Sequence, residues 1–219
     1  MSESGIESQL RQRLSELAAS PPDGWVTAVL TYFSLLQRWN RSINLSGFTL
    51  DPPSADAIDR LLVEPLLGGT LVDSSLPAGQ VGRVLDIGSG GGSPAVPLAL
   101  ALRASGAGTN WLTMVESRQR KAVFLREALR AVDLNGDVLA ERFDELVLPG
   151  ASYQLICSRA VRLEDADALK VLELLAPGGR LLLYHGVDGP GQAVDLRFTS
   201  LGTRQLTSPA GIATVYAPR

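Results

Sequence analysis

The sequence contains very little cysteine or histidine. One cysteine, Cys157, among 219 residues excludes a framework of internal disulfides. It stands in the strand-like run 153–157, where a buried and unreactive thiol is expected. The one histidine, His185, has no cysteine cluster to join, so we predict no metal site.

The chain also lacks a long hydrophobic run. Hydrophobic residues make up 45% of the sequence and the mean hydropathy is +0.13. Even so, no window approaches the roughly 18 uncharged apolar residues of a membrane span. The first residues are acidic and contain no apolar signal core. We therefore expect no membrane association and a cytoplasmic location.

An excess of positive charge is absent as well. The formal net charge is −3 and the sequence pI is about 5.2. Proteins that bind nucleic acid usually present a basic face. The overall balance argues against such binding, while local basic patches remain compatible with it.

The chain is long enough for one substantial core, and its elements fall into two regions. Residues 1–70 are predicted to be a helical cap, because apolar residues recur at helical spacing from Ile6 to Leu17 and from Val26 to Trp39. A third helix is predicted over 54–67, ended by Gly68 and Gly69, and 68–82 is predicted as a joining loop. The main domain is then 71–219. We expect one compact unit and a monomer.

The rest of the chain alternates strands and helices. Strands are predicted over 84–87, 111–115, 137–140, 153–157 and 180–184, and helices over 94–103, 118–132 and 164–175. A tight turn at 177–179 is expected before the last of these strands. Residues 193–200 and 212–217 are predicted to form a terminal hairpin. This order predicts an α/β fold with a doubly wound, mostly parallel sheet and helices on both faces.

The most informative motif is a glycine turn after the first strand. Residues 83–93 read Arg-Val-Leu-Asp-Ile-Gly-Ser-Gly-Gly-Gly-Ser, with Asp86 just before Gly88 and Gly90. Ser93 is predicted to cap the next helix, with Pro94 at its first position. A strand followed by glycines and a helix brings backbone N–H groups close to a ligand at the edge of an α/β sheet.

The ligand is not predicted to be a dinucleotide or a nucleoside triphosphate. The dinucleotide fingerprint requires glycine where Ser93 stands, and the phosphate loop requires a lysine that is absent here. An acid before the glycines resembles the first motif of S-adenosylmethionine-dependent methyltransferases. The cofactor's ammonium and sulfonium groups favour a nearby carboxylate. The alternative is a glycine turn in an unrelated α/β protein.

A second acid, Glu116, ends the next strand. Its spacing from the glycines is close to that expected for a carboxylate that accepts both ribose hydroxyls of an adenosyl group. The alternative is a solvated or helix-capping glutamate. Ser117 is predicted to cap the helix that follows.

The run Leu35-Leu36-Gln37-Arg38-Trp39-Asn40-Arg41-Ser42-Ile43-Asn44-Leu45-Ser46 resembles the N-terminal signature of the 16S ribosomal RNA guanine-N7 methyltransferase G family, formerly called glucose-inhibited division protein B. Further landmarks follow in the family's order over about residues 29–186. They are the glycine motif through Pro97, Glu116–Leu125, Arg142–Leu146, Ser158–Ala160 and Pro177–Arg180.

The resemblance implies a Rossmann-like methyltransferase sheet, S-adenosyl-L-methionine as cofactor and ribosomal RNA or the small ribosomal subunit as partner. Asp86 and Gly90 would belong to the cofactor site, and Gly88 and Ser93 would line its methionine end. Glu116 would face the ribose. The remaining implied contacts are Phe143 and Asp144 at the adenine, and Arg159 reaching into the site from a strand end. The candidate substrate residues are polar and are expected at the cofactor edge or on the cap: Asn44, Arg60, Arg159 and His185.

Guanine N7 carries an exposed lone pair, so methyl transfer to it needs alignment and exclusion of water rather than an acid or base. We therefore predict no catalytic side chain.

The chain departs from the family's pattern on the presumed RNA side. Leu61, Glu64 and Pro65 stand where the family has histidine, aspartate and serine, and His185 stands where it has lysine. Each change is expected to remove a polar or cationic contact to RNA. Three hypotheses remain: a ribosomal RNA guanine-N7 methyltransferase, a methyltransferase with another RNA or a small-molecule substrate, and a cofactor-binding protein without turnover.

Overall fold

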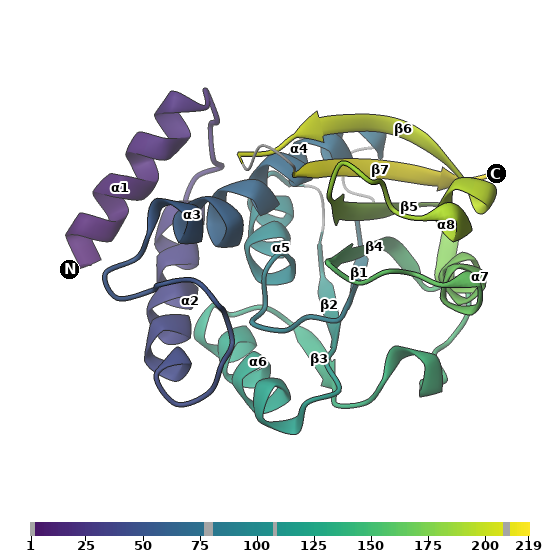
Figure 1. The fold of residues 1–219 in the computed structure, drawn as a ribbon, viewed down its shortest axis with the longest axis horizontal. Helices are drawn as coiled ribbons and strands as arrows, with labels where there is room; N and C mark the ends of the chain where they lie inside the picture. The colour runs from purple at the N-terminus through teal and green to yellow at the C-terminus, as the bar shows by residue number, and fades with distance from the viewer. Residues whose placement is uncertain (1–2, 77–80, 107–108, 208–210) are drawn as a thin grey trace.

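The computed structural model describes residues 3–76, 81–106, 109–207 and 211–219, and their strands form one seven-stranded sheet (Figure 1). The strand order is β3-β2-β1-β4-β5-β7-β6. The bounds are β1 Arg83–Ile87, β2 Trp111–Val115, β3 Gly136–Leu139, β4 Tyr153–Arg159, β5 Leu175–His185, β6 Phe198–Gln205 and β7 Ile212–Pro218. β1 to β5 pair in parallel, and β7 pairs antiparallel with β5 and β6. The predicted mostly parallel sheet is confirmed.

The central strands end at one edge of the sheet. Ile87 of β1 is paired with Val115 of β2 and with Ser158 of β4. Their carboxyl ends therefore meet where the chain turns away into the next helix. In open α/β sheets this edge, at the change of strand order, is where ligands bind.

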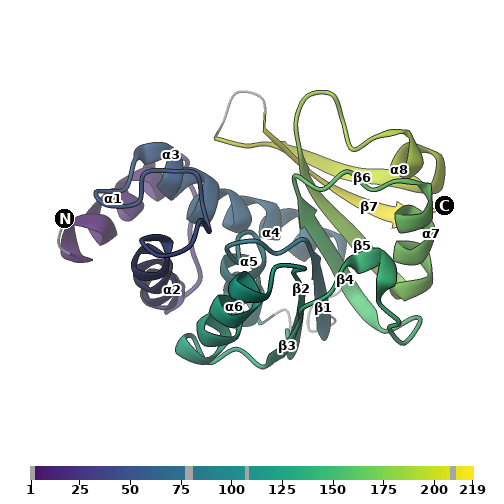
Figure 2. The same ribbon diagram turned by 60° about the horizontal axis from the view of Figure 1, so that its bottom comes forward.

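Helices cover both faces of the sheet (Figure 2). α4 Glu64–Ser75, α5 Ala95–Ala104 and α6 Gln119–Ala131 lie on one face, and α7 Asp165–Leu174 and α8 Gln192–Arg197 lie on the other. Successive strand residues point to opposite faces. Val84 therefore packs in the core beneath α4 to α6, while Leu85 and Ile87 pack in the core beneath α7.

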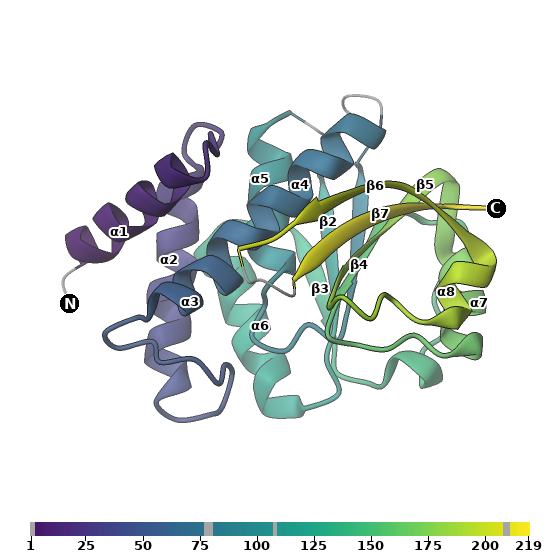
Figure 3. The same ribbon diagram turned by 45° about the horizontal axis from the view of Figure 1, so that its top comes forward.

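The N-terminal helices form a further layer outside α5 and α6 (Figures 1 and 3). They are α1 Glu3–Glu16, α2 Trp25–Asn40, α3 Ala55–Ile58 and the π-helical turn η1 Asp59–Val63. Trp25 donates its indole N–H to the carbonyl of Pro97 at 3.0 Å, and the rings of Trp39 and Phe124 meet edge to face at 5.9 Å. The aromatic residues of α2 thus attach this layer to the helices of the sheet.

Three sequence predictions about element bounds are wrong. The third helix does not end at Gly68 and Gly69, because α4 continues to Ser75. The predicted loop 68–82 is therefore helical over 68–75, and its residues 77–80 lie outside the described part of the chain. Residues 192–197 form α8 rather than a strand, since the chain turns at Gly191 and buries Val194 against α7. The predicted terminal hairpin is β6 with β7. The division at residue 70 stays a prediction.

The predicted turn at 177–179 lies inside β5. There, three residues of β4 (153–155) face six of β5 (175–180), and Gly178 has a φ of 76°. The turn is an interruption in one long strand.

Candidate functional site

The glycine turn after β1 is held by the neighbouring strand. The N–H groups of Gly88 and Ser89 donate to the carbonyl of Val115 at 3.0 and 2.9 Å. Gly88 and Gly90 have φ values of 74° and 55°, a conformation that costs residues with a Cβ free energy. The turn is thus fixed at the carboxyl ends of β1 and β2.

Two glycines of the turn, Gly88 and Gly91, allow close approach of different parts of the chain. A Cβ on Gly88 would lie 2.6 Å from Cγ2 of Val161, which lines the cavities beyond β4. A Cβ on Gly91 would instead lie 2.9 Å from the carbonyl oxygen of Leu45, and Tyr32 donates its hydroxyl to the carbonyl of Gly91 at 2.6 Å. Gly88 therefore faces the ligand edge, whereas Gly91 allows the N-terminal layer to approach the turn.

Both predicted serine caps are wrong. Pro94 occupies the N-cap position of α5, and the Ser93 hydroxyl donates to the carbonyl of Leu61 at 2.9 Å, because the N-terminal layer lies directly above it. Arg118 is the N-cap residue of α6, and its N–H donates to Glu116 Oε1 at 2.8 Å. Ser117 faces a cavity instead.

A cavity of about 460 Å³ opens beside Gly88. We call it the edge cavity. It is lined by Ile87, Gly88, Val115, Ser117, Glu141, Arg142, Phe143, Asp144, Val161, Leu163, Glu164, Ala166 and Asp167. Both predicted adenine contacts, Phe143 and Asp144, belong to this lining. They lie in the single turn η2 Phe143–Glu145.

Asp144 is ionised at neutral pH. Arg142 donates to both of its carboxylate oxygens, at 3.1 and 3.0 Å, and this pairing holds the pKa of Asp144 below its usual range. A carboxylate only accepts hydrogen bonds, so it suits an amino group such as that of adenine.

A lysine that the sequence analysis missed holds η2 in place. Lys170 of α7 donates to the carbonyls of Phe143, Asp144 and Leu146, the last at 2.6 Å, and its Nζ lies 4.9 Å from the centre of the Phe143 ring. Because α7 also contributes to the lining, Lys170 connects two walls of the edge cavity.

Glu116 is turned toward the glycine turn. It is 8% exposed, and its carboxylate accepts the N–H of Gly90 at 2.9 Å as well as that of Arg118. It is not among the residues that line the edge cavity. Its side chain joins the ends of β1 and β2, and a contact to ribose stays a prediction.

Asp86 is a buried acid with one oxygen unused. Oδ1 accepts the thiol of Cys157 at 3.3 Å, while Oδ2 makes no hydrogen bond among the described residues. Burial raises the pKa of Asp86 to about 6. Burial likewise raises the pKa of Cys157, which agrees with the predicted unreactive thiol.

Arg159 ends β4 on the same sheet face as Asp86, and its side chain is only 10% exposed. Its Nη1 donates to the carbonyl of Arg60, and its guanidinium lies 4.5 Å from the centre of the Tyr184 ring. Nη2 lies 3.4 Å from Oε2 of Glu64 without hydrogen-bond geometry, and Nε has no hydrogen-bond partner in the described chain. The Arg159 guanidinium therefore has two nitrogens, Nε and Nη2, that make no hydrogen bond within the described chain.

A second cavity, of about 340 Å³, lies at the ends of β4 and β5 and shares Val161 with the edge cavity. His185 lines it. The ring nitrogens of His185 are both used within the chain, by the carbonyl of Gly186 at 2.7 Å and the hydroxyl of Thr214 at 2.9 Å. Neither ring nitrogen of His185 is therefore left over for the contact that a lysine would make.

The other predicted substrate residues are dispersed. Asn44 is exposed in the loop after α2, next to Leu45, whose carbonyl approaches Gly91. Arg60 lies in η1 and pairs with Glu64 at 3.1 Å. Neither lines either cavity.

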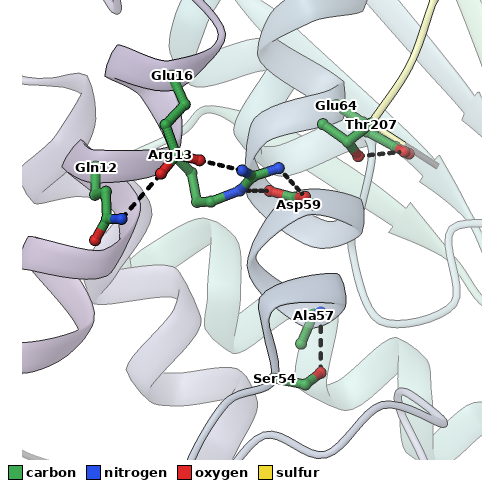
Figure 4. Close-up of polar contacts among 8 residues, drawn as sticks. All are labelled: Gln12, Arg13, Glu16, Ser54, Ala57, Asp59, Glu64 and Thr207. Carbon is green, nitrogen blue, oxygen red and sulfur yellow. Dashed lines mark hydrogen bonds and ion pairs between the residues drawn. The ribbon is translucent and has the colours of Figure 1, made fainter.

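The expectation that Glu64 loses an RNA contact is wrong. Glu64 is fully buried and accepts a hydrogen bond from Arg60 at 3.1 Å. It also accepts the hydroxyl of Thr207 at 2.9 Å (Figure 4). Its carboxylate stands within the protein rather than at an RNA-facing surface. The signal available in the sequence was the apolar surroundings, since leucine and valine precede Glu64 and proline and leucine follow it.

Comparison with known proteins identifies the family. The family described as rRNA small subunit methyltransferase G matches residues 26–198. The chain belongs to this family. A curated member from Alkalilimnicola ehrlichii, named ribosomal RNA small subunit methyltransferase G, is 31% identical over 81% of this chain and 74% of its own length. A member of the same name from Xanthomonas axonopodis pv. citri is 32% identical over 78% and 73%.

Solved structures share the fold of this methyltransferase G family member. The PH0226 protein from Pyrococcus horikoshii OT3 aligns with a TM-score of 0.58 at 14% identity, over 83% of this chain and 99% of its own. An SAM-dependent methyltransferase from Aquifex aeolicus aligns with a TM-score of 0.53 at 14% identity, over 68% and 88%. The predicted methyltransferase fold is confirmed. In the described part of the chain, no helix combines the length and the apolar character that crossing a membrane requires.

Proposed function

We propose that this protein transfers a methyl group from S-adenosyl-L-methionine to N7 of a guanine in small-subunit ribosomal RNA. One observation carries the proposal: the family match over residues 26–198 includes every residue that lines the edge cavity. The region that matches the family therefore contains the whole lining of the edge cavity.

The residues at this edge fit the cofactor's two ends. Phe143 offers apolar contact and Asp144 an acceptor for the adenine in the edge cavity. The unpartnered atoms of Asp86 and Arg159 complement the ammonium and the carboxylate of the methionine end. Gly88, Gly90 and Ser93 would border that end, and each oxygen of Glu116 keeps a lone pair for a ribose hydroxyl.

The chemistry places few demands on the protein. The cofactor supplies a methyl group bound to a positively charged sulfur. The guanine N7 lone pair forms the new bond to carbon as the carbon–sulfur pair returns to sulfur, so positive charge moves onto the base and no proton is exchanged. The protein's part is to hold the two reactants in line and to exclude water.

The acceptor would enter from the second cavity. That cavity adjoins the edge cavity at Val161, which suits two reactants that must meet. A guanine within a paired helix cannot reach it, so the proposed target is an unstacked base. Arg60 and Asn44 of the N-terminal layer are the proposed RNA contacts, and the proposed substrate implies action in the cytoplasm.

Methyl transfer to small ribosomal subunits that lack the modification tests this proposal. Purified protein and cofactor with a labelled methyl group are expected to label the small-subunit RNA. Nucleoside mass spectrometry is expected to find the label in 7-methylguanosine. Label in another nucleoside, or only in a small molecule added to the assay, would assign a different acceptor.

A matched pair of variants ties the activity to the edge cavity. Asp144→Ala is expected to raise the KM for the cofactor by about tenfold, because it removes a charged hydrogen-bond acceptor. Glu145→Ala, the neighbouring acid outside the lining, is expected to stay near wild type. Equal behaviour of the two variants would contradict the placement of the adenine.

A further inference from the structure

The turn η1 is wider than an α-helical turn, and a proline follows it. The N–H of Glu64 donates to the carbonyl of Asp59, five residues earlier. The next backbone nitrogen belongs to Pro65 and carries no hydrogen. In a wide turn the N–H of residue 65 would donate to the carbonyl of Arg60, five residues earlier. In an ordinary α-helical turn it would donate to the carbonyl of Leu61, four residues earlier. Proline at position 65 can make neither hydrogen bond.

Side chains from the cofactor edge take up these two carbonyls. Arg159 donates its Nη1 to the carbonyl of Arg60, and Ser93 donates its hydroxyl to the carbonyl of Leu61 at 2.9 Å. Both donors belong to residues that border the proposed methionine end of the cofactor. The wide turn is thus one point at which the N-terminal layer is attached to the binding edge.

Glu64 holds Arg159 from a second direction. Its buried Oε2 lies 3.4 Å from Nη2 of Arg159, and Oε1 accepts the hydroxyl of Thr207 from the segment between β6 and β7. Tyr184 lies under the guanidinium and donates its own hydroxyl to the carbonyl of Pro65 at 3.2 Å. The carbonyl of Arg60, the carboxylate of Glu64 and the Tyr184 ring therefore fix the guanidinium in three directions.

We propose that Glu64 and Pro65 are positioning residues that orient Arg159 toward the carboxylate at the amino-acid end of the methyl donor. The inference rests on the proposed function. A guanidinium held in this way keeps Nε free of any hydrogen bond in the described chain, and Nη2 as well. A carboxylate is the group that a planar pair of N–H donors binds best.

Two ligands separate this role from a general effect on the site. S-adenosylhomocysteine carries the amino-acid end, whereas 5′-methylthioadenosine keeps the adenosyl group and lacks that end. Calorimetric titration of Glu64→Gln is expected to show about a tenfold weaker affinity for S-adenosylhomocysteine, because the guanidinium loses its ionic partner. Its affinity for 5′-methylthioadenosine is expected to stay within about twofold of wild type. Glu64→Asp, which keeps the charge, is expected to recover most of the loss.

Pro65→Ala is a milder variant, because it restores a backbone N–H that competes with Arg159 and Ser93 for the two carbonyls. It is expected to weaken the affinity for S-adenosylhomocysteine by about threefold and to leave the affinity for 5′-methylthioadenosine unchanged. This variant keeps the test decisive if Glu64→Gln does not fold.

Asp59→Asn provides the matched control on the same turn. Asp59 accepts two hydrogen bonds from Arg13 of α1, at 3.0 and 2.7 Å (Figure 4). The Arg159 guanidinium is instead held by the carbonyl of Arg60 and the carboxylate of Glu64. This variant is expected to lower the unfolding midpoint without changing either affinity.

Equal losses for both ligands in Glu64→Gln and Pro65→Ala, or no loss for either, would overturn the positioning role. Wild-type protein that binds neither ligand would overturn the proposed function together with it. Wild-type binding combined with unselective variants would overturn the positioning role alone.

Discussion

At the scale of single residues, the candidate site contains buried charged groups whose partners are incomplete. Asp86 has an unused oxygen and Arg159 has unused donors, both inside the protein. Removing a charge from water costs several kcal/mol unless a partner compensates it. A ligand with one ammonium and one carboxylate would supply the missing partners, so binding is expected to relieve a cost that the free protein carries.

The pH dependence of stability tests this view of Asp86. Its folded pKa of about 6 lies above the ordinary value of 3.8, so the folded state binds more protons between these values. The contribution of the Asp86 carboxyl to the free energy of unfolding is therefore fully present below about pH 4. It is lost as the pH rises through 6, by an amount on the order of 1–3 kcal/mol. Asp86→Asn, which cannot ionise, is expected to flatten this part of the profile in urea unfolding at pH 5 and pH 8.

The same substitution is expected to weaken the binding of S-adenosylhomocysteine, since the ammonium of the ligand loses the Asp86 carboxylate as its partner. The variant would then be more stable than wild type at pH 8 without ligand and a poorer binder. Parallel pH profiles for the two proteins would show that the Asp86 carboxyl is not the titrating group.

At the scale of elements, the two glycines inside α4 illustrate a close approach between a helix and a strand. A Cβ on Gly68 would lie 2.7 Å from Cζ of Tyr184, whose ring supports Arg159. A Cβ on Gly69 would meet only the end of the Leu98 side chain, at 3.3 Å. Gly68 is therefore required by packing, and Gly69 is not.

Alanine is expected to change the stability differently at these two adjacent positions. Gly68→Ala is expected to destabilise the protein by about 1–3 kcal/mol, because Tyr184 must move. Gly69→Ala is expected to be neutral or to stabilise by up to about 1 kcal/mol, because alanine favours the helix and the leucine can adjust. Chemical denaturation of both variants measures the difference, and two equal losses would contradict this packing.

The turn η2 depends on a single side chain from another element. Lys170→Met keeps the length of the side chain and removes the ammonium that three carbonyls accept from. It is expected to speed hydrogen exchange at the amides of Glu145 and Leu146. It is also expected to weaken the affinity for S-adenosylhomocysteine by about three- to tenfold. Lys170→Arg is expected to retain most of the affinity.

Lys121→Met, at the chain's other lysine, serves as the control for that experiment. Its ligand affinity and its exchange at η2 are expected to match wild type. Unchanged exchange in Lys170→Met would mean that η2 is held by its own backbone hydrogen bonds.

At the scale of the whole molecule, the sheet and its binding edge were predictable because their signals are local. The apolar run ending at Ile87 and the glycines after it stand within a few residues of each other. Short-range patterns of this kind specify strands, turns and the edge at which they end. Phe143 and Asp144 were instead expected from the family resemblance.

The contacts that complete the site were not predictable, because they join distant parts of the chain. Glu64 meets Thr207 across 143 residues, and Arg159 meets the carbonyl of Arg60 across 99. The same reason explains the misplaced end of α4: Gly68 reads as a helix stop in sequence, and only its approach to Tyr184 shows why glycine is there.

The position of β7 has a consequence for synthesis of the protein. β7 lies between β5 and β6, so a strand made after both of them is inserted between them rather than added at the border of the sheet. A nascent chain that has not yet released residues 212–218 leaves the backbone groups of β5 open along one side. Such an open strand is a template for pairing with other chains. Until β7 emerges, a translating chain therefore exposes the open side of β5 to such pairing.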